Sequence, residues 1–311
     1  MRRTKSQIDD IKTAIYLLCE QYQPMTVRQL FYALTVKGVI EKTESEYKNV
    51  VCRLTKEMRL AGELPWDWLA DHTRWQHKPR TYGGISDCLE ESQAAYRRAL
   101  WDPKTNSNYV EIWLEKDALT GVFYDVTSEY DVPLMPCRGY PSLSFLRSAA
   151  ATISWRQKIL TDKWIEEKDE DLVRTMPRLT IYYFGDFDPT GVDISRNIED
   201  RIRSFLIEMD SEYSRDFHFN FKRVAINENQ IKDMNLSTRP TKQSDTRAKK
   251  FGHNVSVELD AVEPNKLRQM IRSCILENID ESELQRIRQT EVAERKLLDQ
   301  VLNFAESIEV K

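Results

Sequence analysis

Apolar residues recur at intervals of three and four along the first part of the chain, a spacing typical of amphipathic helices. One such helix is expected over residues 6–22, and Pro24 ends its pattern. A second is expected over residues 26–37, where Thr26 and Gln29 have the spacing of a capping box. In each helix the apolar positions fall on one stripe, which predicts a face that packs into a core.

A third helix and the segment after it complete this N-terminal part. Thr43 and Glu46 repeat the capping-box spacing and predict a helix that ends near Gly62. The sequence LPWDWLADHTR follows, and its alternation predicts a short strand or hairpin. Three helices and a β segment within residues 1–80 correspond to the plan of a winged helix-turn-helix domain.

Beyond residue 80 the pattern changes to one in which strands and helices alternate. Residues 81–108 are less regular, with a helix expected over 86–100 and a polar linker over 103–108. From residue 109 to 230, runs of β-favouring residues alternate with helical segments, which is typical of an α/β fold with a mostly parallel, Rossmann-like sheet. The strands are expected at 109–114, 132–137, 179–184 and 217–226, and the helices at 119–130, 143–161 and 192–209.

The remaining residues, 231–311, are expected to form a basic loop and a C-terminal helical region. Lysine and arginine are frequent from Arg239 to Lys250, and the polar segment 231–256 predicts a mobile loop. A helix expected over residues 281–308 is long enough to pack across a partner subunit.

Composition and charge narrow the classes of protein. The 311 residues are 41% hydrophobic and 31% charged, and no apolar run is long enough for a signal peptide or a membrane span. Five scattered cysteines and four histidines indicate a reducing cytoplasm and argue against a zinc or disulfide framework. The net charge of −4 argues against nucleic acid as a binding partner, but residues 1–80 carry 14 basic and 10 acidic residues and are thus basic overall. A basic N-terminal part on an acidic body suits a DNA-binding module joined to a metal site.

Acidic residues follow two of the predicted strands. Asp186 and Asp188 come directly after the strand at 179–184, and Glu115 follows the strand at 109–114. Because the carboxyl ends of parallel strands meet in one crevice, these three carboxylates are expected to share a site. Hard oxygen ligands of this kind suit Mg²⁺, which also relieves their mutual repulsion. Lys116, beside Glu115, either neutralises phosphate charge or is an exposed cation.

Two helices of the N-terminal part carry candidate DNA-contacting residues. Tyr32 lies off the apolar stripe of its helix, and Arg28 is one turn before it, so a phenol on the rim beside a guanidinium could attack a phosphodiester. A half-buried structural tyrosine that stacks on an arginine is the alternative. The third helix places three cations on one outer face, either to bind DNA phosphates or as a solvated face. These cations are Lys48, Lys56 and Arg59.

Three motifs resemble one known family. LEKDA at 114–118 and GDFDPTGVDI at 185–194 are similar to the Toprim domain of the topoisomerase VI A subunit and its meiotic double-strand-break relatives. TVRQLFY at 26–32 resembles the segment around the catalytic tyrosine of that family. The resemblance covers about residues 25–75, as a winged helix, and 109–230, as Toprim. It implies Tyr32 as the nucleophile with Arg28 as its electrostatic partner, and Mg²⁺ held by Glu115, Asp186 and Asp188.

The resemblance also implies an activity and partners. The expected reaction is Mg²⁺-dependent cleavage of double-stranded DNA by tyrosine transesterification, which leaves a 5′-phosphotyrosyl link, as in type IIB topoisomerases. A homodimer is implied, in which the tyrosine of one subunit meets the metal site of the other. A topoisomerase role would need a separate ATP-binding B-type subunit or another regulator. The alternatives are a Toprim nuclease in which water attacks, and a non-catalytic DNA-binding protein. The expected location is the cytoplasm, at the nucleoid, without a membrane partner.

Overall fold

The computed structural model describes residues 3–69, 79–102, 108–166, 178–209, 218–242 and 244–309. Its main sheet has four parallel strands in the order β2-β1-β3-β4. The strands are β1 (Asn108–Leu114), β2 (Leu134–Pro136), β3 (Arg178–Phe184) and β4 (His218–Ala225). The predicted α/β class and the four predicted strands are therefore confirmed.

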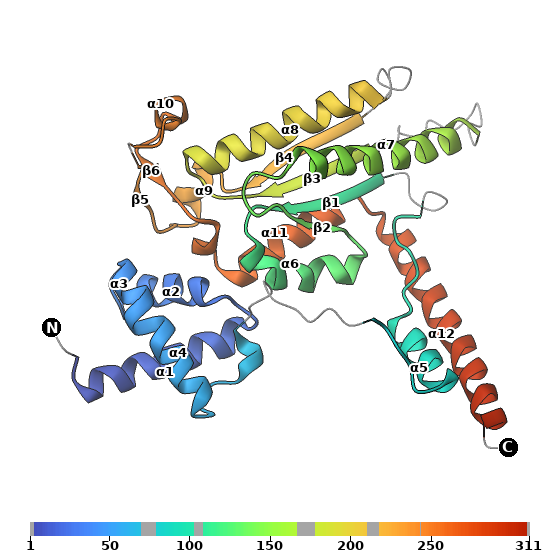
Figure 1. Ribbon diagram of the computed structural model, residues 1–311, viewed down its shortest axis with the longest axis horizontal. Coiled ribbons are helices and arrows are strands. Elements are labelled where there is room, and N and C mark those ends of the chain that lie inside the picture. Colours follow the sequence, from blue (N-terminus) through green and yellow to red (C-terminus); the bar gives the residue numbers. More distant parts are fainter. Residues whose placement is uncertain are drawn as a thin grey trace.

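Helices cover both faces of this sheet (Figure 1). On one face lie α7 (Leu143–Glu166) and α8 (Pro189–Met209), and on the other lie α6 (Thr120–Thr127) and α11 (Pro264–Leu276). Strands covered on both sides need apolar residues at nearly every position, and β1 and β3 are buried along almost their whole length. Because α11 contributes to this core, the core continues beyond residue 230, where the sequence pattern places the end of the sheet domain.

The N-terminal helices have a core of their own. Thr26 accepts a hydrogen bond from the backbone of Gln29, and the Gln29 side chain accepts one from the backbone of Thr26, so the predicted capping box is present. The helical segment predicted from Thr43 is also present and contains a π-helical turn. These elements are α1 (Lys5–Tyr22), α2 (Val27–Val36), α3 (Glu44–Glu46), the π turn (Tyr47–Val51) and α4 (Cys52–Leu60).

The expected β segment after Gly62 differs from the prediction. Trp66–Trp68 form a 3-10 turn, and Leu69 makes a single parallel bridge to Met25, so no hairpin begins here. Trp68 packs its ring on Tyr16 of α1, with 5.1 Å between the centroids. The prediction of a strand over 66–68 is therefore wrong, because packing of the indole overrides the alternation. The rest of the expected hairpin, at 70–74, lies outside the described residues.

The segment predicted as a loop at 231–256 folds into short elements. After α9 (Glu228–Asp233), the strands β5 (Arg239–Pro240) and β6 (Val255–Ser256) pair antiparallel, with α10 (Ala248–Phe251) between them. We call residues 239–256 the basic hairpin. Phe187, just after β3, bridges Val257 and packs on the ring of Phe251, at 4.9 Å between centroids. The expected loop is thus a hairpin seated at the carboxyl end of β3.

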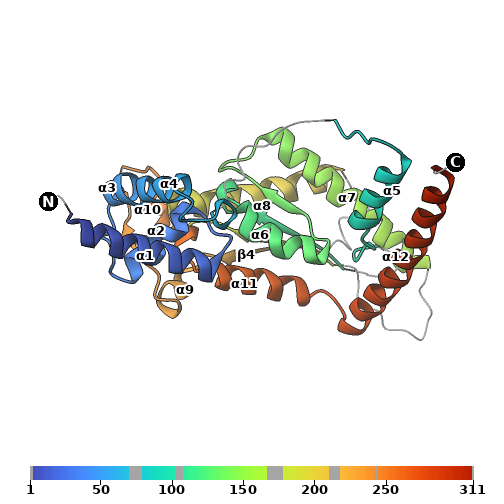
Figure 2. The same cartoon turned by 90° about the horizontal axis from the view of Figure 1, so that it is seen from below.

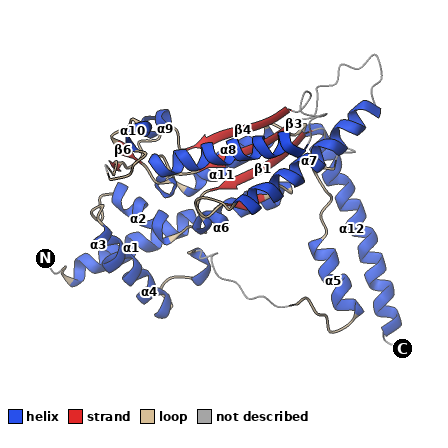
Figure 3. Cartoon of the chain, turned by 45° about the horizontal axis from the view of Figure 1, so that its top comes forward, coloured by secondary structure: helices blue, strands red, loops and turns tan. Residues whose placement is uncertain are grey.

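Two helices form an arm beside the sheet. Figures 1, 2 and 3 all show α5 (Ile85–Ala95) alongside α12 (Glu281–Glu309), the long helix that the sequence predicts. The Tyr96 hydroxyl donates to Glu294 at 2.6 Å, so the arm also has polar contacts. The expected linker residues 103–107 lie outside the described part of the chain. Within that part, no helix is both long and apolar enough to cross a membrane.

Candidate carboxylate site and tyrosine helix

The first two carboxylates of the predicted site lie together at the carboxyl edge of the sheet. β1 and β3 are paired so that Leu114 and Phe184 are level, and Glu115 and Asp186 therefore leave the sheet side by side. Glu115 Oε2 accepts a hydrogen bond from the backbone N–H of Asp186 at 2.9 Å. Burial, followed by the nearby charge of Asp186, raises the pKa of Glu115 to about 7. Burial also raises the pKa of Asp186, against the opposing charge of Lys116, so desolvation disfavours the ionised form of both carboxyls.

Two glycines leave room for the Glu115 carboxylate. A Cβ atom at Gly185 would lie 2.5 Å from Glu115 Oε2, and one at Gly191 would lie 3.0 Å from it. Asp188, the third predicted ligand, has a different role in the described geometry. Its Oδ1 accepts from the N–H of Gly191 at 2.7 Å and so caps the start of α8. Its Oδ2 lies 3.6 Å from the guanidinium of Arg239.

Lys116 lies among carboxylates. Its Nζ is 3.1 Å from Asp186, 2.7 Å from Asp260 and 3.5 Å from Glu258. Burial alone would lower the pKa of Lys116, but the charges of Asp260 and Asp186 outweigh it and raise that pKa. The ammonium group thus pairs with the protein's own acids and is not the exposed cation of one sequence interpretation; the other, a role at phosphate, stays a prediction.

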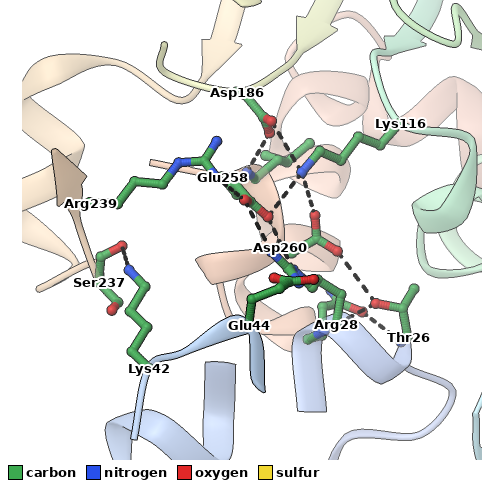
Figure 4. Close-up of polar contacts among 12 residues, drawn as sticks. Thr26, Arg28, Lys42, Glu44, Lys116, Asp186, Ser237, Arg239, Glu258 and Asp260 are labelled. Carbon is green, nitrogen blue, oxygen red and sulfur yellow. Dashed lines mark hydrogen bonds and ion pairs between the residues drawn. The ribbon is translucent and has the colours of Figure 1, made fainter. Parts of the chain in front are cut away.

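Glu258 links the sheet domain to the tyrosine helix (Figure 4). Both of its oxygens accept from Arg28 of α2 at 3.3 Å, and it also pairs with Lys116 and Arg239. We call Glu258 and these three cations the Glu258 hub. Burial acts to raise the pKa of Glu258, but Lys116 and the two arginines together hold it at about 2. The Glu258 carboxylate therefore connects α2, the end of β1 and β5 through its three ion pairs.

Further polar contacts bind the N-terminal helices to the sheet domain. Lys42 Nζ donates to the carbonyl oxygens of Ser237 at 2.9 Å and Thr238 at 2.8 Å. The Thr26 hydroxyl is 3.5 Å from Asp260. Figure 4 shows these contacts on either side of the Glu258 hub. Polar groups at this edge of the sheet therefore help to hold the two units together.

Tyr32 is not on an exposed rim. Its side chain belongs to the N-terminal core and is only 3% exposed, so the predicted rim position is wrong. The physical reason is that α2 packs a second side against residues 259–261, which cover the region beside the apolar stripe. Burial and the charge of Glu258 raise the pKa of Tyr32 to about 12, against the opposing effect of Arg28. Arg28 does lie one turn away, 5.8 Å from the Tyr32 ring centroid, but its charge favours the phenolate less than burial and Glu258 disfavour it.

The predicted row of DNA-binding cations is shorter than expected. Lys48 and Lys56 are exposed, and Lys48 lies 3.8 Å from Glu44. Arg59 instead turns to its own domain, where it donates to the carbonyl oxygens of Trp66, at 2.8 Å, and Leu69. The prediction of Arg59 as part of an outer face is therefore wrong, because these carbonyls need donors in the turn that replaces the hairpin.

A cavity of about 540 Å³ lies between the tyrosine helix and the strand ends. It is lined by Arg28 and Tyr47 from the N-terminal domain, by Lys116 and Arg138, and by the carboxylates of Glu115, Asp186, Glu258 and Asp260. Sequence reasoning missed Glu258 and Asp260. Their spacing in VELDA matches that of Asp186 and Asp188, and this repeated pair of acids is the signal that could have identified them.

The donor set fits Mg²⁺ in kind, since it consists of carboxylates at a strand-end crevice with space kept by two glycines. The described arrangement is not a coordination sphere: among the described residues no three metal-ligating side chains are grouped around one point. Cations of the protein itself neutralise the acids instead. No family model matches this chain, and comparisons with curated proteins and with solved structures gave no match.

Proposed function

We propose that this protein is a Mg²⁺-dependent DNA-cleaving transesterase. The sheet domain is assigned as Toprim, and the N-terminal helices as a winged-helix type of module with Tyr32 as the nucleophile. The observation that carries the proposal is that α2, the helix of Tyr32, is attached through Arg28 and Glu258 to the edge where Glu115 and Asp186 meet. Such an arrangement brings the helix that carries the phenol next to oxygen ligands of the kind that a phosphoryl-transfer site needs.

In this mechanism each residue has a distinct chemical role. Glu115, Asp186 and Asp188 would hold Mg²⁺, which when bound neutralises charge on the phosphate. The Tyr32 oxygen forms a bond to phosphorus, the bond from phosphorus to the 3′ oxygen breaks, and the phenolic proton is balanced by the proton that the 3′ hydroxyl gains. Arg28 offers guanidinium donors to the phosphate oxygens as charge develops. Because the new link conserves the phosphodiester energy, the strand can be rejoined.

In this proposal the described arrangement is a closed state, from which cleavage does not proceed. Tyr32 is buried, Arg28 is paired with Glu258 and Glu44, and Lys116 lies among the acids that would bind the metal. Cleavage therefore requires the N-terminal helices to move away from the carboxylate edge. In a homodimer, the released tyrosine would act at the metal site of the partner subunit.

Hydrolysis is the second candidate, favoured by one observation. Burial and a pKa raised to about 12 leave Tyr32 poorly suited to attack in this state, whereas a water molecule can approach the exposed cavity beside Asp186. A Toprim nuclease of this kind would use the same carboxylates and leave Tyr32 as a structural residue. Its products would be free DNA ends, without attached protein.

The deciding experiment incubates supercoiled plasmid with the protein and Mg²⁺, then denatures the mixture with and without protease. Transesterification predicts broken DNA whose 5′ ends carry protein until protease is added, and it predicts that Tyr32→Phe abolishes both the adduct and the break. The control is Tyr22→Phe, a change to a half-buried tyrosine of the same domain. Cleavage that survives Tyr32→Phe indicates hydrolysis. Full activity in Asp186→Asn would contradict both reactions.

A further inference from the structure

The strongest local excess of positive charge belongs to the basic hairpin and not to the helices that the sequence singles out. Five of the twelve residues 239–250 are lysine or arginine, and one is aspartate, in a chain whose net charge is −4. Of the predicted DNA-contacting cations, Lys116 is committed to carboxylates and Arg59 to backbone carbonyls. The charge available near the carboxylate edge therefore has another source.

The hairpin is fixed next to the candidate site by contacts with the start of α8. Thr190, just after the DxD motif, donates to Asp245 at 2.9 Å. Arg247 Nε lies 3.4 Å from Asp193, and its guanidinium is 5.5 Å from the ring centroid of Tyr140. Arg239, at the other end of the hairpin, pairs with Asp188 and Glu258. The two arginines thus position the hairpin at the edge that carries the carboxylates.

The three lysines of the hairpin differ from these arginines. Lys242, Lys249 and Lys250 are exposed, and their ammonium groups make no hydrogen bond or ion pair within the described part of the chain. Three like charges on so short a segment repel one another and do not stabilise the fold. They also do not line the cavity beside Asp186, where a single small anion would have to be surrounded. Separate, exposed ammonium groups suit a series of anions along an extended ligand.

We propose that the basic hairpin is a phosphate clamp, in which Lys242, Lys249 and Lys250 bind successive backbone phosphates of the DNA segment that flanks the scissile phosphate. The proposal rests on the function proposed above and adds a binding surface to it. Lysine side chains are flexible point charges, so contacts of this kind position the duplex without reading its bases. The clamp therefore confers affinity that depends on salt and not on sequence.

The test measures equilibrium binding of a fluorescently labelled mixed-sequence duplex by anisotropy, without Mg²⁺, over a titration of NaCl. The clamp variant is Lys242→Gln with Lys249→Gln and Lys250→Gln. The matched control removes the same charge from exposed lysines on other elements, as Lys158→Gln with Lys222→Gln and Lys296→Gln. All six side chains are exposed, so circular dichroism and melting temperature are expected to match the wild type for both variants.

The expected result is a change in the slope of log affinity against log salt concentration. Each lost phosphate contact lowers the slope by about 0.9, so the clamp variant should lose about 2.7, with binding on the order of a hundredfold weaker near 0.1 M salt. The control should keep the wild-type slope. A wild-type slope in the clamp variant, or an equal loss in both variants, overturns the clamp alone. Absence of salt-dependent DNA binding by the wild type overturns the proposed function as well.

Discussion

Glu258→Gln tests whether the hub fastens the tyrosine helix to the carboxylate edge. The substitution preserves the size of the side chain but removes the charge that pairs with Arg28, Lys116 and Arg239. The pKa of Glu258 is about 2, against an ordinary 4.5, which corresponds to roughly 3 kcal/mol of stabilisation of the folded state at neutral pH. Only 8% of the side chain is exposed, so solvent screens this interaction little. We expect the variant to lose free energy of unfolding of that order.

The sign of the pH dependence provides a second measure of the same effect. A carboxyl whose pKa is lowered by folding stabilises the protein above its unfolded pKa, and that stabilisation is lost as the pH falls from about 4.5 towards 2. The variant has no titrating group at this position. The difference in stability between wild type and Glu258→Gln should therefore be largest at neutral pH and narrow across that acid range.

The assay is urea unfolding followed by tryptophan fluorescence, at neutral pH and at several acid values. Glu57→Gln is the control, since Glu57 forms an exposed pair with Arg53 on α4, and such pairs contribute less than about 1 kcal/mol. A Glu258→Gln variant no less stable than Glu57→Gln would refute the reasoning. So would a destabilisation that stays constant throughout the acid range, because the charge of Glu258 would then not be its cause.

Three further predictions follow from the carboxylates and the glycines beside them. Gly191→Ala should destabilise the protein by about 1–3 kcal/mol in urea unfolding, because the added Cβ atom would press on the Asp186 carbonyl oxygen and approach Glu115. Unchanged stability would contradict this packing. Mg²⁺ affinity, measured by calorimetry, should rise as pH increases through about 7, where Glu115 ionises, and Glu115→Gln should abolish that rise. Burial raises the pKa of Glu111, so ionisation of this carboxyl destabilises the folded state as the pH rises. Glu111→Gln should therefore increase the melting temperature more at alkaline than at acid pH. Equal effects at both pH values would argue against this reasoning.

The parts of the site that depend on the parallel sheet could be predicted from the sequence. β1 and β3 are long apolar runs, and the geometry of parallel strands then determines that Glu115 and Asp186 emerge at the same edge. Glu258 has only the acid pair of VELDA to mark it, because it follows a two-residue strand, and two of its three partners are 142 and 230 residues away in the sequence. Contacts at such separations leave no local periodicity. The same limitation explains Tyr32, since the pattern of one helix shows its own core face but not a second element that covers it.

Under the proposed function, the distribution of charge would make the closed state stable until ligands arrive. Arg28, Lys116 and Arg239 neutralise carboxylates that would otherwise repel one another, so the arrangement is stable without DNA or metal. In the proposed transesterase, DNA would bring phosphates that compete for the same cations, and Mg²⁺ would compete for the same acids. Neither ligand alone replaces both halves of each ion pair, because each leaves one partner buried without its counterion. Opening should therefore require both together, which would keep the tyrosine covered until DNA and metal are at the site.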